Sequence, residues 1–149
     1  HPKDEEGFVD LFKYKKSINY IENTPLKEFI IDDIIVIPIP LIHSKNTTGY
    51  IIKTKNKTFA YLTDCQGIEK SNHNFLKNYD FDYLFIDACF IPPKQGNHLN
   101  YEEAIKLIDS LNVKNAFLMH QSHTNMSYLI ENNIELKYKY LYKNQEFEL

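Results

Sequence analysis

From about residue 28 onward, short apolar runs rich in β-branched residues alternate with amphipathic stretches. The segments "FDYLFIDAC" (81–89) and "NAFLMH" (115–120) are continuous apolar runs of the kind found in strands buried on both faces. An amphipathic stretch, "YEEAIKLIDSLN" (101–112), separates them. Strands that alternate with helices form α/β domains, and 149 residues are enough for one hydrophobic core. The sequence therefore predicts a single α/β domain.

The stretch 101–112 carries both the start signal and the periodicity of a helix. Asn100 stands at the N-cap position, and Glu103 follows three residues later, as in a capping box. The apolar residues recur at helical spacing and form one face, which consists of Ala104, Ile105, Leu107, Ile108 and Leu111. This face is predicted to pack against the sheet.

Other segments continue the same alternation. Residues 32–43 are predicted to form a strand, which Pro38 and Pro40 restrict to an edge or an irregular place in the sheet. Further predicted elements are a hairpin at 48–64 that turns at Asn56-Lys57, helices at 68–79 and 126–133, and a last strand at 135–142. Residues 1–27 are lysine-rich and weakly patterned, and are interpreted as a connecting segment or small lobe before the domain at 28–149.

Composition disfavours several classes of protein. The net charge of −3 offers no basic field for a long nucleic acid, so a nucleic-acid partner is disfavoured. No apolar run is long enough to span a membrane. The two cysteines, Cys65 and Cys89, are too few and too far apart for a disulfide framework, so a reducing cytoplasm is the predicted location.

Metal-binding residue types stand where predicted strands end. His43 follows "IPIPLI", Asp64 follows "FAYLT", and His120 follows "NAFLM". A fourth candidate, His98, lies in an irregular loop just before the helix at 101–112. Sites in α/β sheets gather where strands end and loops begin. Each of these residues alone is more often a turn former or a structural residue, so the prediction depends on their joint placement.

Six segments, read in chain order, resemble the metallo-β-lactamase superfamily, and most closely its PhnP-like branch of cyclic phosphodiesterases. They are "DEEGFVDLFK" (4–13), "IPIPLIHSKNTTGYIIKT" (37–54), "AYLTDCQG" (60–67), "YLFIDACFIPP" (83–93), "NHLNYEEA" (97–104) and "LMHQSH" (118–123). They match the C-terminal portion of the family's domain. The family's His-x-His-x-Asp-His motif, which supplies four further metal ligands, does not occur in the sequence. The chain is therefore interpreted as the C-terminal part of a longer protein.

The resemblance implies an αββα sandwich, of which this chain supplies the C-terminal half and a connecting segment. It also implies two divalent metal ions, Zn²⁺ or Mn²⁺, as cofactors. His43 matches a histidine of the first metal site, Asp64 matches the carboxylate that bridges both ions, and His120 matches the histidine of the second site. Imidazole and carboxylate groups are suitable ligands for either metal.

The resemblance assigns roles to further residues. His98 matches a catalytic histidine near the scissile phosphate, where an imidazole can bind the phosphate or protonate the leaving oxygen. His123 matches a ligand of an additional structural zinc ion, whose cysteine ligands have no counterpart in this sequence. Asp87 is expected to accept a hydrogen bond from a ligand histidine, and Ser122 to orient groups near the metals.

The implied function is the hydrolysis of a small phosphodiester, such as a ribosyl cyclic phosphate, by a hydroxide held between two metal ions. The partner is then a small molecule, no membrane is involved, and a homodimer is compatible with the family. Two alternatives stay open. One is a tRNA 3′-processing nuclease similar to ribonuclease Z, and the other is a non-catalytic half-domain that lacks the first metal motif.

Overall fold

The computed structural model describes residues 22–93, 96–142 and 145–146. Most of the predicted segment 1–27 lies outside the described residues, so its nature stays a prediction. Within these residues, seven strands form one sheet: β1 (Phe29–Ile31), β2 (Ile34–Leu41), β3 (Thr47–Lys53), β4 (Thr58–Leu62), β5 (Asp80–Asp87), β6 (Asn112–Met119) and β7 (Lys139–Tyr140). The described part of the chain also forms the helices α1 (Lys70–Leu76), α2 (Tyr101–Asp109) and α3 (His123–Glu131).

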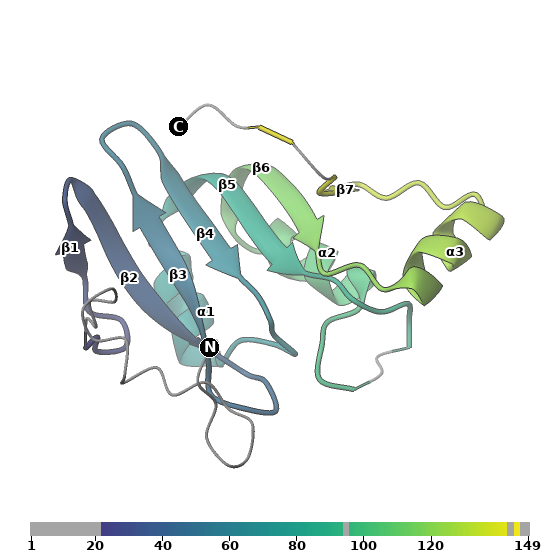
Figure 1. The fold of residues 1–149 in the computed structure, drawn as a ribbon, viewed down its shortest axis with the longest axis horizontal. Helices are drawn as coiled ribbons and strands as arrows, with labels where there is room; N and C mark the ends of the chain where they lie inside the picture. The colour runs from purple at the N-terminus through teal and green to yellow at the C-terminus, as the bar shows by residue number, and fades with distance from the viewer. Residues whose placement is uncertain (1–21, 94–95, 143–144, 147–149) are drawn as a thin grey trace, which may run out of the picture.

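The strands lie in the sheet in the same order as in the sequence (Figure 1). From β1 to β4 each strand pairs antiparallel with the next, whereas β4, β5, β6 and β7 pair in parallel. Each parallel step needs a crossover connection, and α1, α2 and α3 lie in the three crossovers. The α/β class predicted from the alternating runs is confirmed.

The two faces of the sheet are covered differently. Figure 1 shows α1 and α2 on one face, and no helix of the described residues over the other. Ala60 and Leu84 pair across β4 and β5, are fully buried and belong to the same core as the apolar residues of α2. On the opposite face, Tyr61, Phe85 and Phe117 occupy paired positions of β4, β5 and β6, and the rings of Phe85 and Phe117 stack with centroids 5.8 Å apart. The core therefore lies between the helices and one face of the sheet.

Replacing Leu84 with alanine is expected to lower the free energy of unfolding by about 2–5 kcal/mol, because the fully buried side chain leaves a cavity in this core. Urea denaturation measures the change. Ile130, on α3, is a matched control, since its side chain is 68% exposed and its replacement with alanine should change stability by less than about 0.5 kcal/mol. Equal losses in the two variants would contradict this description of the core.

The start of α2 is the one that the sequence predicts. The side chain of Asn100 accepts a hydrogen bond from the Glu103 N–H at 2.9 Å, and the Asn100 N–H donates to the Glu103 carboxylate at 3.1 Å. This completes the predicted capping box. The cap fixes the end of the loop that carries His98, two residues earlier in the chain.

Pro38 and Pro40 are predicted to restrict their strand to an edge or an irregular place in the sheet, whereas β2 as a whole lies between β1 and β3. However, β1 pairs only with residues 34–36, so both prolines lie beyond it. The Pro38 carbonyl accepts a hydrogen bond from the Leu26 N–H at 2.8 Å, outside the β2–β3 ladder. In an antiparallel strand the N–H and carbonyl of one residue point to the same side, so the ladder with β3 needs no N–H from this proline.

Some boundaries also differ from the sequence prediction. The short strand β1 was not predicted, because three residues give too little periodicity to identify a strand. The helix α3 begins at His123, and Ser122 caps it by accepting a hydrogen bond from the Asn125 N–H at 3.2 Å. The last strand is limited to β7, since only two residues of β6 pair with it. No helix in the described part of the chain is long and apolar enough to cross a membrane.

Candidate metal site

The carboxyl ends of β4, β5 and β6 meet at one edge of the sheet, because these strands are parallel. Asp64 follows β4, Asp87 ends β5, and His120 follows β6, while His98 comes from the loop before α2. Each of these four side chains offers a potential ligand atom, and the four atoms lie within 4.8 Å of one another. The structure thus brings together four of the residues that the sequence suggested for a site.

Asp87 is the buried member of the cluster. Its Oδ2 accepts hydrogen bonds from His98 Nδ1 at 2.6 Å and from the Cys65 N–H at 2.9 Å. Its Oδ1 accepts a third from the Cys89 N–H at 3.2 Å. A fully buried carboxylate needs such donors, because removing a charge from water is costly. The same Oδ2 lies 3.7 Å from Nδ1 of His120, the predicted ligand histidine, so His98 is the closer partner and the expected role of Asp87 stays a prediction.

The contacts of His98 determine which of its nitrogens faces the site. The Asp87 carboxylate can only accept, so the proton of a neutral His98 lies on Nδ1 and Nε2 is left for another partner. The ring stands nearly perpendicular to the rings of His120 and Phe90, with centroids 4.5 and 5.8 Å away. The side chain is 18% exposed. His98 is therefore held in one orientation while solvent and small ligands can still reach it.

Asp64 and His120 face each other on the exposed side of the cluster. Asp64 Oδ1 lies 3.2 Å from His120 Nδ1, and the two side chains are 46% and 44% exposed. The Thr63 hydroxyl donates a hydrogen bond to the same Asp64 oxygen at 2.9 Å. Two ligands of a tetrahedral zinc ion with bonds of about 2.0 Å lie about 3.3 Å apart. The pair thus has both the spacing and the ligand chemistry that suit a divalent metal ion.

The turn that follows β6 places His120 and Ser122. His120 has a φ of 59°, in the left-handed region, which is uncommon for a residue other than glycine and occurs more often at functional sites. Two residues on, the Ser122 N–H and hydroxyl both donate to the Cys89 carbonyl oxygen, at 3.2 and 2.8 Å. Ser122 therefore joins the segments that follow β5 and β6, which is compatible with its predicted orienting role.

His43 lies beside the cluster but is not one of its four members. Its Nδ1 donates a hydrogen bond to the Asn97 carbonyl oxygen at 2.9 Å, which leaves Nε2 available as a ligand. Its ring centroid is 4.9 Å from that of His98. The Ile42 N–H and carbonyl pair with the segment after β4, through Gly67 and Gln66, and bring His43 to the same edge of the sheet. His43 thus lies at the same edge of the sheet as the cluster, with its ring beside that of His98.

The remaining residues singled out from the sequence are His123 and the two cysteines. His123 is exposed at the first position of α3, and its role in an additional zinc site stays a prediction. Cys65 and Cys89 are buried thiols, as expected. Burial raises the pKa of the Cys89 thiol, and the nearby carboxylates of Asp87 and Asp64 raise it further. The Cys89 thiol is therefore less acidic than a free cysteine thiol.

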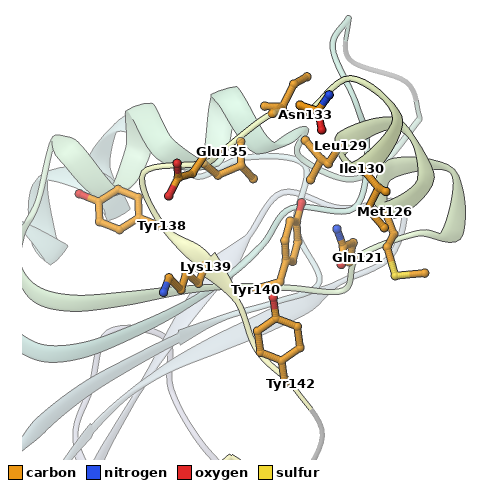
Figure 2. Close-up of a pocket in the computed structure, with 12 residues that line it drawn as sticks. Gln121, Met126, Leu129, Ile130, Asn133, Glu135, Tyr138, Lys139, Tyr140 and Tyr142 are labelled. Carbon is orange, nitrogen blue, oxygen red and sulfur yellow. The ribbon is translucent and has the colours of Figure 1, made fainter.

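A cavity of about 680 Å³ lies away from this cluster, between α3 and the chain that follows it (Figure 2). It is mainly apolar, and its lining consists of Gln121, Met126, Leu129, Ile130, Asn133, Ile134, Glu135, Leu136, Tyr138, Lys139, Tyr140 and Tyr142. None of the four clustered residues lines it, so the cavity is not the metal site.

Residues 2–121 match the profile of a protein family described as the beta-lactamase superfamily domain. The match covers most of the chain, so the chain belongs to this family. The resemblance inferred from the six sequence segments is thereby confirmed at the level of the superfamily. Proteins of this superfamily are hydrolases, and its fold suggests divalent metals as cofactors.

Solved structures share the fold. A diphosphatase from the PhnP family is 23% identical with a TM-score of 0.68, and the likeness covers 89% of this chain and 49% of that one. Human tRNase Z, short form, is 18% identical with a TM-score of 0.60, over 77% of this chain and 41% of that one. The metallo-β-lactamase fold protein YhfI from Bacillus subtilis is 16% identical with a TM-score of 0.65, over 93% of this chain and 61% of that one. These neighbours confirm the predicted fold, including its likeness to the PhnP branch.

The chain spans between 41% and 61% of the length of these three proteins. No curated protein sequence matches it. The activity, substrates and partners of the whole protein are therefore proposals, and a cytoplasmic location and a homodimer stay predictions.

Proposed function

We propose that the protein is a metal-dependent phosphodiesterase that acts on a small phosphodiester, such as a ribosyl cyclic phosphate. The observation that carries the proposal is the placement of His98, which Asp87 holds through Nδ1 and whose ring lies against that of His120. A histidine that can transfer a proton, next to divalent-metal ligands, is what metal-assisted hydrolysis requires. Membership of a hydrolase superfamily and the likeness to a PhnP-family diphosphatase support this reaction class.

In this proposal His43, Asp64 and His120 hold the divalent metal ions, Zn²⁺ or Mn²⁺. When bound, the metals stabilise negative charge on the phosphoryl oxygens and lower the pKa of the water that attacks phosphorus. The Asn97 carbonyl fixes the tautomer of His43 that presents Nε2 as a ligand. Three ligands do not complete two metal sites, so the proposal needs ligands besides His43, Asp64 and His120.

His98 is the proposed general acid. Asp87 fixes its orientation and compensates the positive charge of its protonated form, so that His98 can deliver a proton from Nε2 to the leaving oxygen. His98 reaches the site from the loop before α2, whose end is held by the capping box. A structural zinc at His123 is a separate proposal that this mechanism does not need.

The full-length protein that contains these residues, loaded with Mn²⁺, is expected to hydrolyse bis-p-nitrophenyl phosphate and a cyclic ribose phosphate. Release of nitrophenolate and phosphorus NMR measure the two reactions. A chelator should abolish both, and added Mn²⁺ should restore them, because the metals stabilise charge on the phosphoryl oxygens. Absence of turnover by protein whose metal content has been verified would contradict the proposal and would favour a non-catalytic domain.

A tRNA nuclease similar to ribonuclease Z is the second candidate, supported by the shared fold with human tRNase Z. Gripping tRNA requires a basic surface, whereas these 149 residues carry a net charge of −3. Salt-dependent binding of tRNA, measured by fluorescence anisotropy near physiological ionic strength, would favour this candidate. Hydrolysis of the small substrates without tRNA binding would favour the phosphodiesterase.

A further inference from the structure

Asn125, in α3, is a fully buried polar residue that the sequence analysis did not single out. Its Nδ2 lies 3.1, 3.3 and 3.4 Å from the carbonyl oxygens of Ala88, Cys89 and Phe90, and 2.6 Å from the hydroxyl oxygen of Tyr140. Its Oδ1 has no hydrogen-bond partner among the described residues. An oxygen in the place of Nδ2 would face three carbonyl oxygens, so the surroundings determine the orientation of the amide.

Tyr140, in β7, acts on the same carbonyl as Asn125. Its hydroxyl donates to the Ala88 oxygen at 2.6 Å and accepts from Asn125 Nδ2. Burial raises the pKa of Tyr140 well above its usual range, so the hydroxyl keeps the proton that it donates. Two buried side chains from separate elements, α3 and β7, therefore hold the first residue after Asp87.

The segment 88–90 supports both members of the Asp87–His98 pair. The Cys89 N–H donates to Asp87 Oδ1 at 3.2 Å. The Phe90 N–H donates to the carbonyl of Leu99, the residue after His98, at 3.2 Å, and the Phe90 ring packs against the His98 ring. A shift of this segment would therefore move the carboxylate and the imidazole relative to each other.

We propose that Asn125, together with Tyr140, is a positioning residue of the site: by holding the segment 88–90, it sets the geometry of the Asp87–His98 hydrogen bond. The inference rests on the proposed function, which gives His98 its task. Neither residue touches the four clustered ligand atoms through the contacts described above, so each acts through the backbone of 88–90. A misplacement of about 1 Å at a reacting group can lower a rate by about 100-fold, so such support is functionally important.

Proton NMR of the full-length protein tests the inference without requiring metal or turnover. The proton on His98 Nδ1, in a 2.6 Å hydrogen bond to a buried carboxylate, should give a downfield, slowly exchanging signal, identified by its loss in His98→Gln. In the variants Asn125→Ala and Tyr140→Phe, this signal should change its chemical shift or become too broad to detect. Tyr138→Phe is the matched control, because its hydroxyl donates to Asp109 at 2.6 Å, remote from the segment 88–90.

An unchanged signal in both Asn125→Ala and Tyr140→Phe would overturn the inference, as would an equal change in Tyr138→Phe or the absence of the signal from the wild-type protein. If Asn125→Ala does not fold, Tyr140→Phe decides, since it removes a single oxygen and keeps the ring. Kinetics give a second readout: kcat should fall about tenfold or more with KM within about twofold, because positioning acts on the reacting groups. Lack of wild-type turnover would refute the phosphodiesterase proposal alone, since the NMR result is independent of it.

Discussion

Replacing Asp64 with alanine is expected to remove bound metal and to lower phosphodiesterase activity by more than about a thousandfold. Asp64 Oδ1 faces His120 Nδ1 at 3.2 Å, and in the proposed function both residues would hold the metal ions. Loss of a metal ion removes several kcal/mol of transition-state stabilisation. Each factor of ten in rate corresponds to about 1.4 kcal/mol of activation free energy. Elemental analysis of the purified variant and the rate of nitrophenolate release measure the two effects.

The control for this variant is Asp109→Asn. Asp109 also pairs with charged and hydroxyl groups, Lys137 and Tyr138, but it lies at the end of α2 and away from the cluster. Its replacement should leave metal content and rate unchanged. A metal content equal to wild type in Asp64→Ala would show that the metal is bound elsewhere and that Asp64 has been misassigned.

Replacing His98 with glutamine is expected to lower kcat by about 100-fold to 10,000-fold, the range for loss of a general acid, while the metal content stays at the wild-type level. The two readouts distinguish a ligand from a general acid. Replacing a metal ligand should lower the metal content, whereas replacing a general acid should leave it unchanged. The decrease should be smaller for a substrate with a p-nitrophenolate leaving group, which needs little help from a proton donor. Steady-state kinetics with activated and unactivated substrates measure this difference.

His73→Gln is the matched histidine control. His73 lies on α1, and its Nε2 is hydrogen-bonded to the Ser110 hydroxyl at 2.7 Å. The substitution therefore removes a histidine that is hydrogen-bonded, like His98, but lies outside the site. It should leave kcat within about twofold of wild type, as for other substitutions remote from the reacting groups. Loss of metal from His98→Gln would contradict the general-acid assignment and would make His98 a ligand.

The elements with the strongest hydrophobic patterns were predictable from the sequence. Two predictable features are the buried apolar runs of β5 and β6 and the capping box of α2. Both are local in the sequence, so they can be recognised without knowing which elements pack against them. The short β1 and the limits of β7 were not predictable, since they depend on which strand lies next to them. How far β1 extends along β2 was not predictable either, and it leaves Pro38 and Pro40 on the stretch of β2 that β1 does not cover.

The candidate site was predictable to a similar degree. Residue types at strand ends, together with the family resemblance, indicated Asp64, His98 and His120, and parallel strand order explains why they meet. The sequence suggested that Asp87 accepts from a ligand histidine, but which histidine it contacts depends on the path of a loop. Asn125 gave no signal, since an asparagine in a helix becomes informative only when tertiary contacts place its amide against buried carbonyl groups.

Anomalous diffraction from crystals of the full-length protein grown with Zn²⁺, recorded on both sides of the zinc absorption edge, tests the central claim most directly. The account predicts an anomalous peak about 2.0–2.2 Å from Asp64 and His120, with His98 Nε2 close by but outside bonding distance. A peak bonded to His98, or no peak beside Asp64 and His120 in crystals that contain zinc, would contradict it.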